Sequence, residues 1–195
     1  MNGRAALVII DMQRQFTTSD APFLVPGADA LVGRIIAAAD RARSSEIPVI
    51  WVTQQVRPAV GPGRTSRRYG RPDIHQGSMA DFDERLEVDR DIVVVKHMQS
   101  GFFGTDLETV LRGLDIDTVI LAGVTTNVCV LATAIDAGAR DFGVVLASDL
   151  TASLPVRRGE EVIMEAEAVQ GAAEAFVLHA LGEVAETKDI RGLGG

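Results

Sequence analysis

The sequence predicts an α/β protein with a parallel sheet of five or six strands covered by helices on both faces. Continuous apolar runs recur along the chain, which is typical of strands buried on both faces. Helix-like segments separate these runs, and such alternation favours a parallel sheet. The chain has 195 residues and no Pro/Gly/Ser-rich linker divides it, so we expect one domain over residues 1–195.

The predicted elements follow one another in a regular order. The first apolar run is followed by Asp11. The predicted strands cover residues 5–10, 49–53, 92–95, 119–122 and 144–147. The predicted helices cover residues 28–43, 106–114, 127–139 and a long last stretch at about 157–184.

Composition excludes several classes of partner. The net charge is −8, from 27 acidic and 19 basic residues, and this sign disfavours binding to nucleic acid or to an anionic membrane surface. The apolar run at residues 5–10 is too short for a signal peptide or a spanning helix. We therefore expect a cytoplasmic protein that acts on a small-molecule substrate.

Cysteine and histidine are scarce. Cys129 is the one cysteine, so an intrachain disulfide is excluded, and the residue is either a packed thiol or a reactive one. The three histidines, His75, His97 and His179, form no metal-binding spacing. We expect no metal and no cofactor.

Three chemically active side chains fall at one edge of the predicted sheet. Ligands of open parallel sheets bind beyond the carboxyl ends of the strands. Asp11 and Lys96 each follow a predicted strand directly, and Cys129 lies at the start of the helix after residues 119–122. A helix start and a nearby Lys96 would lower the thiol pKa, and Asp11 would act as the base. Individually, each residue also has an ordinary structural explanation, such as capping a turn or packing in the core.

The connection at residues 55–76 is long enough to be a substrate-facing loop. Arginine binds carboxylates through paired donors, so the loop favours a carboxylate-bearing amide such as a ureido acid. A solvated basic loop or a subunit contact that balances the acidic surface explains the same residues. Its arginines are Arg57, Arg64, Arg67, Arg68 and Arg71. The substrate-binding candidates are Gln13, Phe16, Gln54, Arg57, Tyr69 and Phe103, and core packing is an alternative for the two phenylalanines.

Three motifs in order resemble the isochorismatase-like cysteine hydrolases. The resemblance covers residues 5 to about 180, and residues 148–153 resemble a weaker fourth element. The motifs are residues 9–13 (IIDMQ), Lys96 followed by residues 100–107 (SGFFGTDL), and residues 123–130 (GVTTNVCV).

The resemblance implies a three-layer Rossmann-like domain and a catalytic triad of Asp11, Lys96 and Cys129. It also implies a non-proline cis peptide at Val124-Thr125 and an oxyanion hole formed by the N–H groups of Thr125 and Cys129. Family members are usually oligomers, so we expect a homo-oligomer. Residues 127–139 or the last helix would supply the contact, although a face that covers the sheet explains the same apolar residues.

Departures from the family pattern narrow the activity. Nicotinamidases of this family carry an Asp-x-His metal site after the second strand, where this chain reads Thr53-Gln54-Gln55. This difference predicts that no catalytic metal is bound and disfavours nicotinamide as the substrate. The presence of Cys129 favours attack on a carbonyl, and hence a cysteine hydrolase that cleaves a C–N bond of a small amide, ureido or carbamoyl compound. The alternatives are an isochorismatase-type vinyl ether hydrolase that uses Asp11 as acid, and a catalytically silent binding protein on the same fold.

Overall fold

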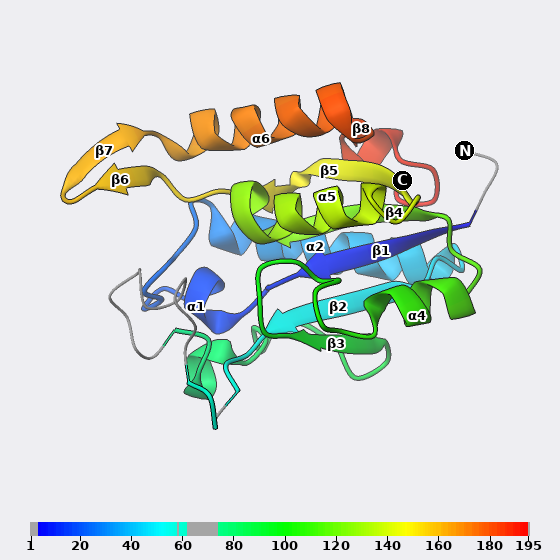
Figure 1. The fold of residues 1–195 in the computed structure, drawn as a ribbon, viewed down its shortest axis with the longest axis horizontal. Helices are drawn as coiled ribbons and strands as arrows, with labels where there is room; N and C mark the ends of the chain where they lie inside the picture. The colour runs from blue at the N-terminus through cyan, green and yellow to red at the C-terminus, as the bar shows by residue number, and fades with distance from the viewer. Residues whose placement is uncertain (1–3, 58, 62–73, 195) are drawn as a thin grey trace.

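The computed structural model describes residues 4–57, 59–61 and 74–194. Within these residues one sheet holds six strands in the order β3-β2-β1-β4-β5-β8, and every neighbouring pair is parallel (Figure 1). The strands are β1 (Ala5–Ile10), β2 (Val49–Gln54), β3 (Ile92–Lys96), β4 (Thr118–Val124), β5 (Gly143–Ala152) and β8 (Glu183–Ala185). The predicted fold class is confirmed.

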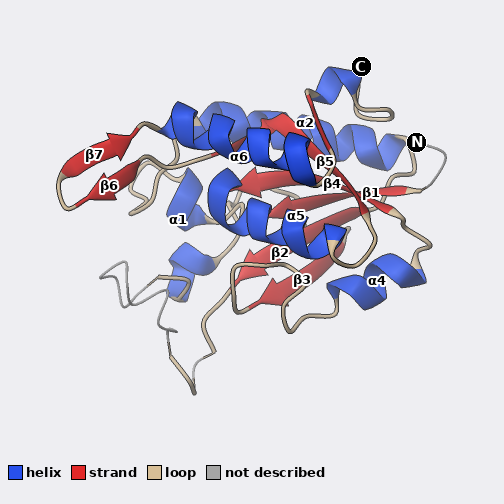
Figure 2. Cartoon of the chain, turned by 45° about the horizontal axis from the view of Figure 1, so that its top comes forward, coloured by secondary structure: helices blue, strands red, loops and turns tan. Residues whose placement is uncertain are grey.

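Helices cover both faces of the sheet (Figures 1 and 2). On one face α2 packs through Leu31 and Ile35 onto strand residues such as Ile9. On the other face α4, α5 and α6 share a second core with the alternate strand residues. The α-helices are α1 (Arg14–Thr17), α2 (Ala28–Ser44), α4 (Leu107–Gly113), α5 (Leu131–Gly138) and α6 (Ala166–Ala180). Shorter turns are η1 (Gly77–Ala80), η2 (Thr126–Val130) and η3 (Thr187–Asp189).

The central strands are buried on both faces, as their continuous apolar runs predict. β1, β2 and β4 are buried almost throughout. β3 differs, because it lies at the edge of the sheet and leaves Val93 and Val95 exposed. A continuous apolar run therefore did not distinguish an edge strand from a central one.

The prediction of one long last helix over residues 157–184 was wrong. The chain first forms an antiparallel hairpin of β6 (Val156–Arg158) and β7 (Glu161–Met164), which projects from the body at the left of Figure 1. Gly159 takes a positive φ of 62° in its turn, which glycine adopts without steric strain. Only then does α6 begin, and β8 follows it.

Among the described residues, no helix combines the length and the apolar character needed to cross a membrane.

Gly123, near the end of β4, allows this strand to approach β1 closely at the carboxyl edge of the sheet. Its φ is +102°, and a Cβ built on it would lie 2.0 Å from the carbonyl oxygen of Ile10. Only glycine fits here, because a side chain would push β4 away from β1 next to Asp11.

We predict that Gly123→Ala destabilises the protein by at least about 3 kcal/mol, because the new methyl group meets rigid backbone. Urea denaturation measures the change. The matched control is Gly33→Ala on an exposed position of α2, where a Cβ meets nothing within 4 Å, and we expect it to stabilise by about 0.5 to 1 kcal/mol. Equal stabilities of the two variants would contradict the close approach.

Candidate active site

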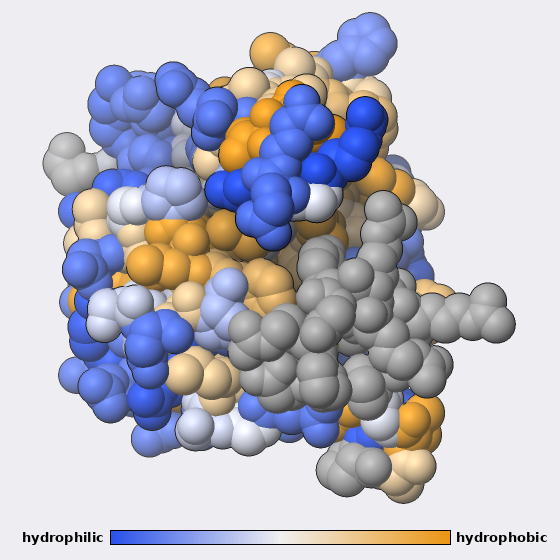
Figure 3. All heavy atoms as spheres, turned by 90° about the vertical axis from the view of Figure 1, so that its left-hand side faces the viewer, coloured by the Kyte–Doolittle hydropathy of each residue, from blue (hydrophilic) through white to orange (hydrophobic). Residues whose placement is uncertain are grey.

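The sheet topology selects one place for a ligand. β1 connects to β2 on one side, whereas β4 lies on its other side, so the strand order reverses between β1 and β4. In open parallel sheets, the crevice beyond the carboxyl ends at such a reversal is the usual binding site. Figure 3 views the molecule from this edge, where apolar residues lie among hydrophilic ones.

Asp11 ends β1 and is fully buried. Its backbone takes a φ of +53°, and its N–H donates to the carbonyl oxygen of Val52 at 2.8 Å. Asp is among the non-glycine residues that tolerate this left-handed conformation. The conformation ends the strand and holds the carboxylate at the sheet edge.

Lys96 is the last residue of β3, and it is also fully buried. Its Nζ lies 2.8 Å from Oδ2 of Asp11 and donates to Oε1 of Gln54 at 2.9 Å and to the carbonyl oxygen of Met98 at 3.2 Å. Burial, the largest single effect, lowers the pKa of Lys96, but its interactions with Asp11 above all, and with Cys129, together raise that pKa above its ordinary value. The ammonium is therefore charged and has an acceptor for each of its three protons.

Cys129 completes the group. It lies on the π-helical turn η2 between β4 and α5, where the carbonyl oxygen of Thr125 accepts hydrogen bonds from the N–H groups of Val128 and Val130. Its Sγ lies 3.7 Å from Oε1 of Gln54, and its side chain interacts with both Asp11 and Lys96. The predicted convergence of the three side chains at this edge is therefore present in the structure.

The expectation of a lowered thiol pKa was wrong. Burial, the largest effect, and the negative charge of Asp11 raise the pKa of Cys129 to about 12, although Lys96 acts in the opposite direction. The helix start and the cation do not compensate for the buried position and the neighbouring carboxylate. Cys129 is thus a neutral thiol in the free protein.

The cis peptide that the family resemblance implied is present at Val124-Thr125. It directly precedes the turn that carries Cys129. The participation of the Thr125 and Cys129 N–H groups in an oxyanion hole remains a prediction.

The substrate-binding candidates occupy different positions. Gln54 is buried and contacts both Lys96 and Cys129. Gln13 is buried too, but its amide nitrogen donates to the backbone carbonyls of Gln54 and Ala80. Gln13 therefore links the end of β2 to η1. Phe16 packs in the core beneath α2, and Phe103 is 62% exposed.

The predicted loop lies largely outside the described residues. Arg57 is described and exposed. The positions outside are Arg64, Arg67, Arg68, Tyr69 and Arg71. Their proposed contacts with a substrate carboxylate stay a prediction.

Sequence reasoning missed two buried residues, His75 and Gln15, which hydrogen bonds link to Gln13 and Gln54. His75 is 6% exposed and is held by the side chain of Gln15, which follows β1 on the short helix α1. A histidine in a long irregular stretch gives no sign of burial, and only the alternation of Gln13 and Gln15 hints at paired polar side chains.

No group of three His, Cys, Asp or Glu side chains suited to a metal ion occurs in the part of the chain that the structure describes. The absence of a catalytic metal stays a prediction.

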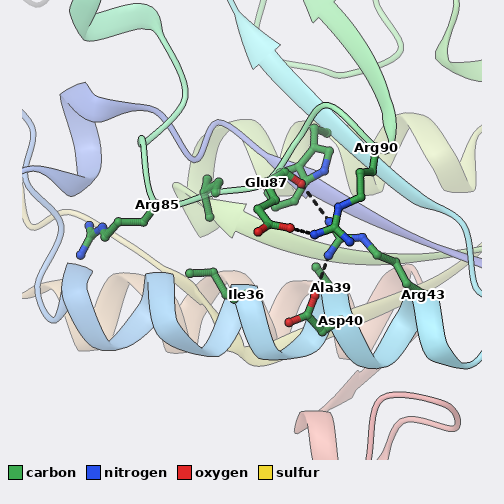
Figure 4. A pocket seen from close by; sticks show the side chains of 9 residues that line it. Ile36, Ala39, Asp40, Arg43, Arg85, Glu87 and Arg90 are labelled. Atoms are coloured by element: carbon green, nitrogen blue, oxygen red, sulfur yellow. Dashed lines mark hydrogen bonds and ion pairs between the residues drawn. The ribbon is translucent and has the colours of Figure 1, made fainter.

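A cavity of about 360 Å³ lies beside α2, and Cys129 is not among its lining residues (Figure 4). Its arginines are already paired with carboxylates. Arg43 binds Asp91 at 2.6 Å and Asp40 at 2.7 Å, Arg85 binds Asp83 and Asp29, and Arg90 binds Glu87. The paired charges make this cavity a poor site for an anion.

Comparison with known proteins identifies the family. The model of the isochorismatase domain matches residues 5–179, which include Asp11, Lys96 and Cys129. The chain belongs to the isochorismatase family. Its similarity to the ureidoacrylate amidohydrolase RutB of Methylorubrum extorquens is 34% identity over 168 residues, covering 72% of this chain and 67% of the relative. The RutB of Agrobacterium fabrum is 32% identical over 174 residues, with 75% of each chain covered.

Solved structures of the isochorismatase family share the fold. A cysteine hydrolase from Pseudomonas syringae pv. phaseolicola superimposes with a TM-score of 0.89 at 29% identity, covering 97% of this chain and 92% of that chain. The N-carbamoylsarcosine amidase of Thermoplasma acidophilum gives a TM-score of 0.77 at 26% identity, covering 96% and 99%. The protein is thus a hydrolase of the isochorismatase family.

We predict that Asp11→Asn lowers the pKa of Cys129, because it removes the carboxylate that disfavours the thiolate and leaves Lys96 in place. The rate of alkylation by iodoacetamide, measured between pH 6 and 11, reports the thiolate fraction. The wild-type rate is expected to rise up to the end of this range, and the variant rate to level off at lower pH. An unchanged profile would contradict the electrostatic coupling.

Proposed function

We propose that the protein is a cysteine hydrolase that cleaves a C–N bond of a small amide, ureido or carbamoyl compound through a thioester acyl-enzyme. The observation that carries the proposal is the buried ion pair of Asp11 and Lys96 beside Cys129. A nucleophile, a base and a cation within one buried group are the components that covalent attack on a carbonyl needs.

The first step is attack by sulfur. Because Cys129 is protonated in the free protein, the proton must leave as the C–S bond forms. Asp11 accepts it, because its buried carboxylate interacts directly with the side chain of Cys129. Lys96 remains charged. It stabilises the negative charge that develops on the sulfur while the sulfur electron pair forms the bond to the carbonyl carbon.

The second step expels the nitrogen. The carbonyl oxygen becomes an oxyanion, and we assign its stabilisation to the backbone N–H groups of Thr125 and Cys129. When the C–N bond breaks, Asp11 returns its proton to the leaving nitrogen. The products are an amine or ammonia and a thioester on Cys129.

The third step releases the acyl group. Asp11, again a carboxylate, takes a proton from water while the water oxygen attacks the thioester carbonyl. Collapse of this second tetrahedral intermediate breaks the C–S bond, and the thiol regains the proton from Asp11. No redox partner is needed, and Lys96 carries the same charge throughout.

The substrate class rests on the relatives and on the loop. The names of the relatives describe a ureidoacrylate amidohydrolase and an N-carbamoylsarcosine amidase, both of which denote C–N cleavage. Ureidoacrylate and N-carbamoylsarcosine also carry a carboxylate, which suits the arginines that begin at Arg57. We therefore place a carboxylate on the preferred substrate.

We predict that Cys129→Ala lowers ammonia release from ureidoacrylate or N-carbamoylsarcosine on the order of a thousandfold or more, because the nucleophile is lost. The matched control is His179→Gln on an exposed position of α6, which we expect to retain wild-type turnover. If Cys129→Ala kept isochorismate hydrolysis and Asp11→Asn lost it, the vinyl ether mechanism would replace this one. Wild type that turns over none of these compounds would favour a silent binding protein.

We further propose that the protein works in the cytoplasm as a homo-oligomer. A reactive thiol stays reduced there. Apolar side chains are exposed on the projecting hairpin and on α6, including Ile163, Met164, Phe176 and Leu178. Such a surface favours burial against a second copy.

We predict a mass of at least two chains by sedimentation velocity at micromolar concentration. Phe176→Glu and Leu178→Glu together are expected to lower this mass, because each places a charge on the apolar surface. A monomeric wild type would contradict the proposal.

A further inference from the structure

Gln15 and His75 make a two-point contact that fixes the protonation of the His75 ring. The backbone N–H of His75 donates to Oε1 of Gln15 at 3.1 Å, so the other amide atom of Gln15 is the nitrogen. This Nε2 lies 2.7 Å from Nδ1 of His75, and an amide nitrogen only donates. Nδ1 is therefore the bare nitrogen, and the ring proton lies on Nε2.

The same orientation follows from the other end of the network. The amide nitrogen of Gln13 donates to the carbonyl oxygens of Gln54, at 2.9 Å, and of Ala80. Its Oε1 then accepts a hydrogen bond from Nε2 of Gln15 at 3.1 Å. Because backbone carbonyls only accept, they set the direction of the whole chain from Gln13 through Gln15 to His75.

The ring is held as a neutral group beside the catalytic ion pair. Burial lowers the pKa of His75 to about 4, while Asp11 raises it and Lys96 lowers it. Hydrogen bonds also connect the ring to the pair. Gln15 binds the ring and Gln13, and Gln13 donates to the backbone carbonyl of Gln54. The side chain of Gln54 in turn accepts from Lys96. The backbone carbonyl of His75 accepts from the N–H of Val56 at 3.0 Å, which fastens this segment to the chain that leaves β2.

We propose that the Nε2–H edge of His75 donates a hydrogen bond to an oxygen of the substrate, and that Gln15 sets this donor. The inference rests on the proposed function, because it places the substrate beside Asp11 and Cys129. The Nδ1 edge is occupied by Gln15, so the donor edge faces away from α1. His75 is thus a specificity-determining residue.

The neutral donor defines the chemical group that it recognises. A carboxylate, ureido or amide oxygen accepts from Nε2–H, whereas an ammonium or N–H group does not. A cationic ring would add a second positive charge near Lys96. Because Gln15 keeps Nδ1 as an acceptor, the ring stays neutral and still presents one donor, Nε2–H.

Nitrogen NMR of the histidine rings tests the protonation state. At pH 7 we expect His75 as the Nε2–H form. His97 is the internal contrast, because its Nδ1 lies 2.7 Å from the carbonyl oxygen of Gln55, which only accepts, and it should be the Nδ1–H form. His75→Gln and His97→Gln assign the signals. A cationic or Nδ1–H ring at His75 would overturn the inference.

Two further variants test the role of Gln15 and the position of the donor. Gln15→Glu places an acceptor at Nδ1, so we expect the ring to bind a second proton at a higher pH than in wild type. Alkylation of Cys129 with iodoacetamide leaves an amide beside the ring and is expected to shift the Nε2 signal of His75 and to leave that of His179 unchanged. No shift on alkylation would place the donor away from the substrate.

Steady-state kinetics with ureidoacrylate or N-carbamoylsarcosine distinguish an effect of a His75 variant on substrate binding from an effect on folding. His75→Phe keeps a planar ring without a donor, and we expect KM to rise about tenfold with a smaller change in kcat. His75→Gln keeps a neutral N–H, and KM should stay within about threefold of wild type. If KM is unchanged in His75→Phe and Cys129 still forms its acyl-enzyme, the inference about His75 is refuted and the proposed function stands. Absence of any acyl-enzyme refutes the proposed function instead, and the response to alkylation still decides the role of His75.

Discussion

The ion pair between Asp11 and Lys96 is the interaction on which the candidate site depends. The two residues end β1 and β3, with β2 between them, and Gln54 at the end of β2 accepts from Lys96. Removing one partner of a buried pair leaves an uncompensated charge, at a cost of about 3 to 5 kcal/mol. The pair therefore requires the three strand ends to stay in register, and the close approach at Gly123 brings β4 and the turn of Cys129 to the same place.

The same pair influences the protonation of Cys129, the proposed nucleophile. Lys96 lowers the pKa of Cys129 and Asp11 raises it, and burial, the largest effect, holds that pKa above its ordinary value. In the proposed mechanism the sulfur becomes nucleophilic only when Asp11 takes its proton. Around this pair lie neutral groups, the amides of Gln54, Gln13 and Gln15 and the ring of His75. Such an environment suits a neutral carbonyl as the reacting group, with any substrate charge held farther out.

Much of the fold and the centre of the site was predictable from the sequence, because both depend on local patterns. Buried strands and their ends show as apolar runs followed by Asp11 or Lys96, and the motif around Cys129 supplied the third residue. The hairpin before α6 was missed because short exposed strands carry little apolar signal. The pKa of Cys129 and the role of His75 depend on burial and on contacts between segments about 60 residues apart. A local sequence pattern indicates neither the pKa of Cys129 nor the contacts of His75.

Trapping the acyl-enzyme tests the proposed covalent chemistry most directly. Wild-type protein mixed with ureidoacrylate or N-carbamoylsarcosine, quenched in acid within the first turnover and digested, is analysed by mass spectrometry. We expect an acyl group on the peptide that contains Cys129, and we expect hydroxylamine to release it, as it releases a thioester. Turnover of these compounds with an unmodified Cys129 at every quench time would contradict the central claim that the sulfur forms a covalent bond to the substrate.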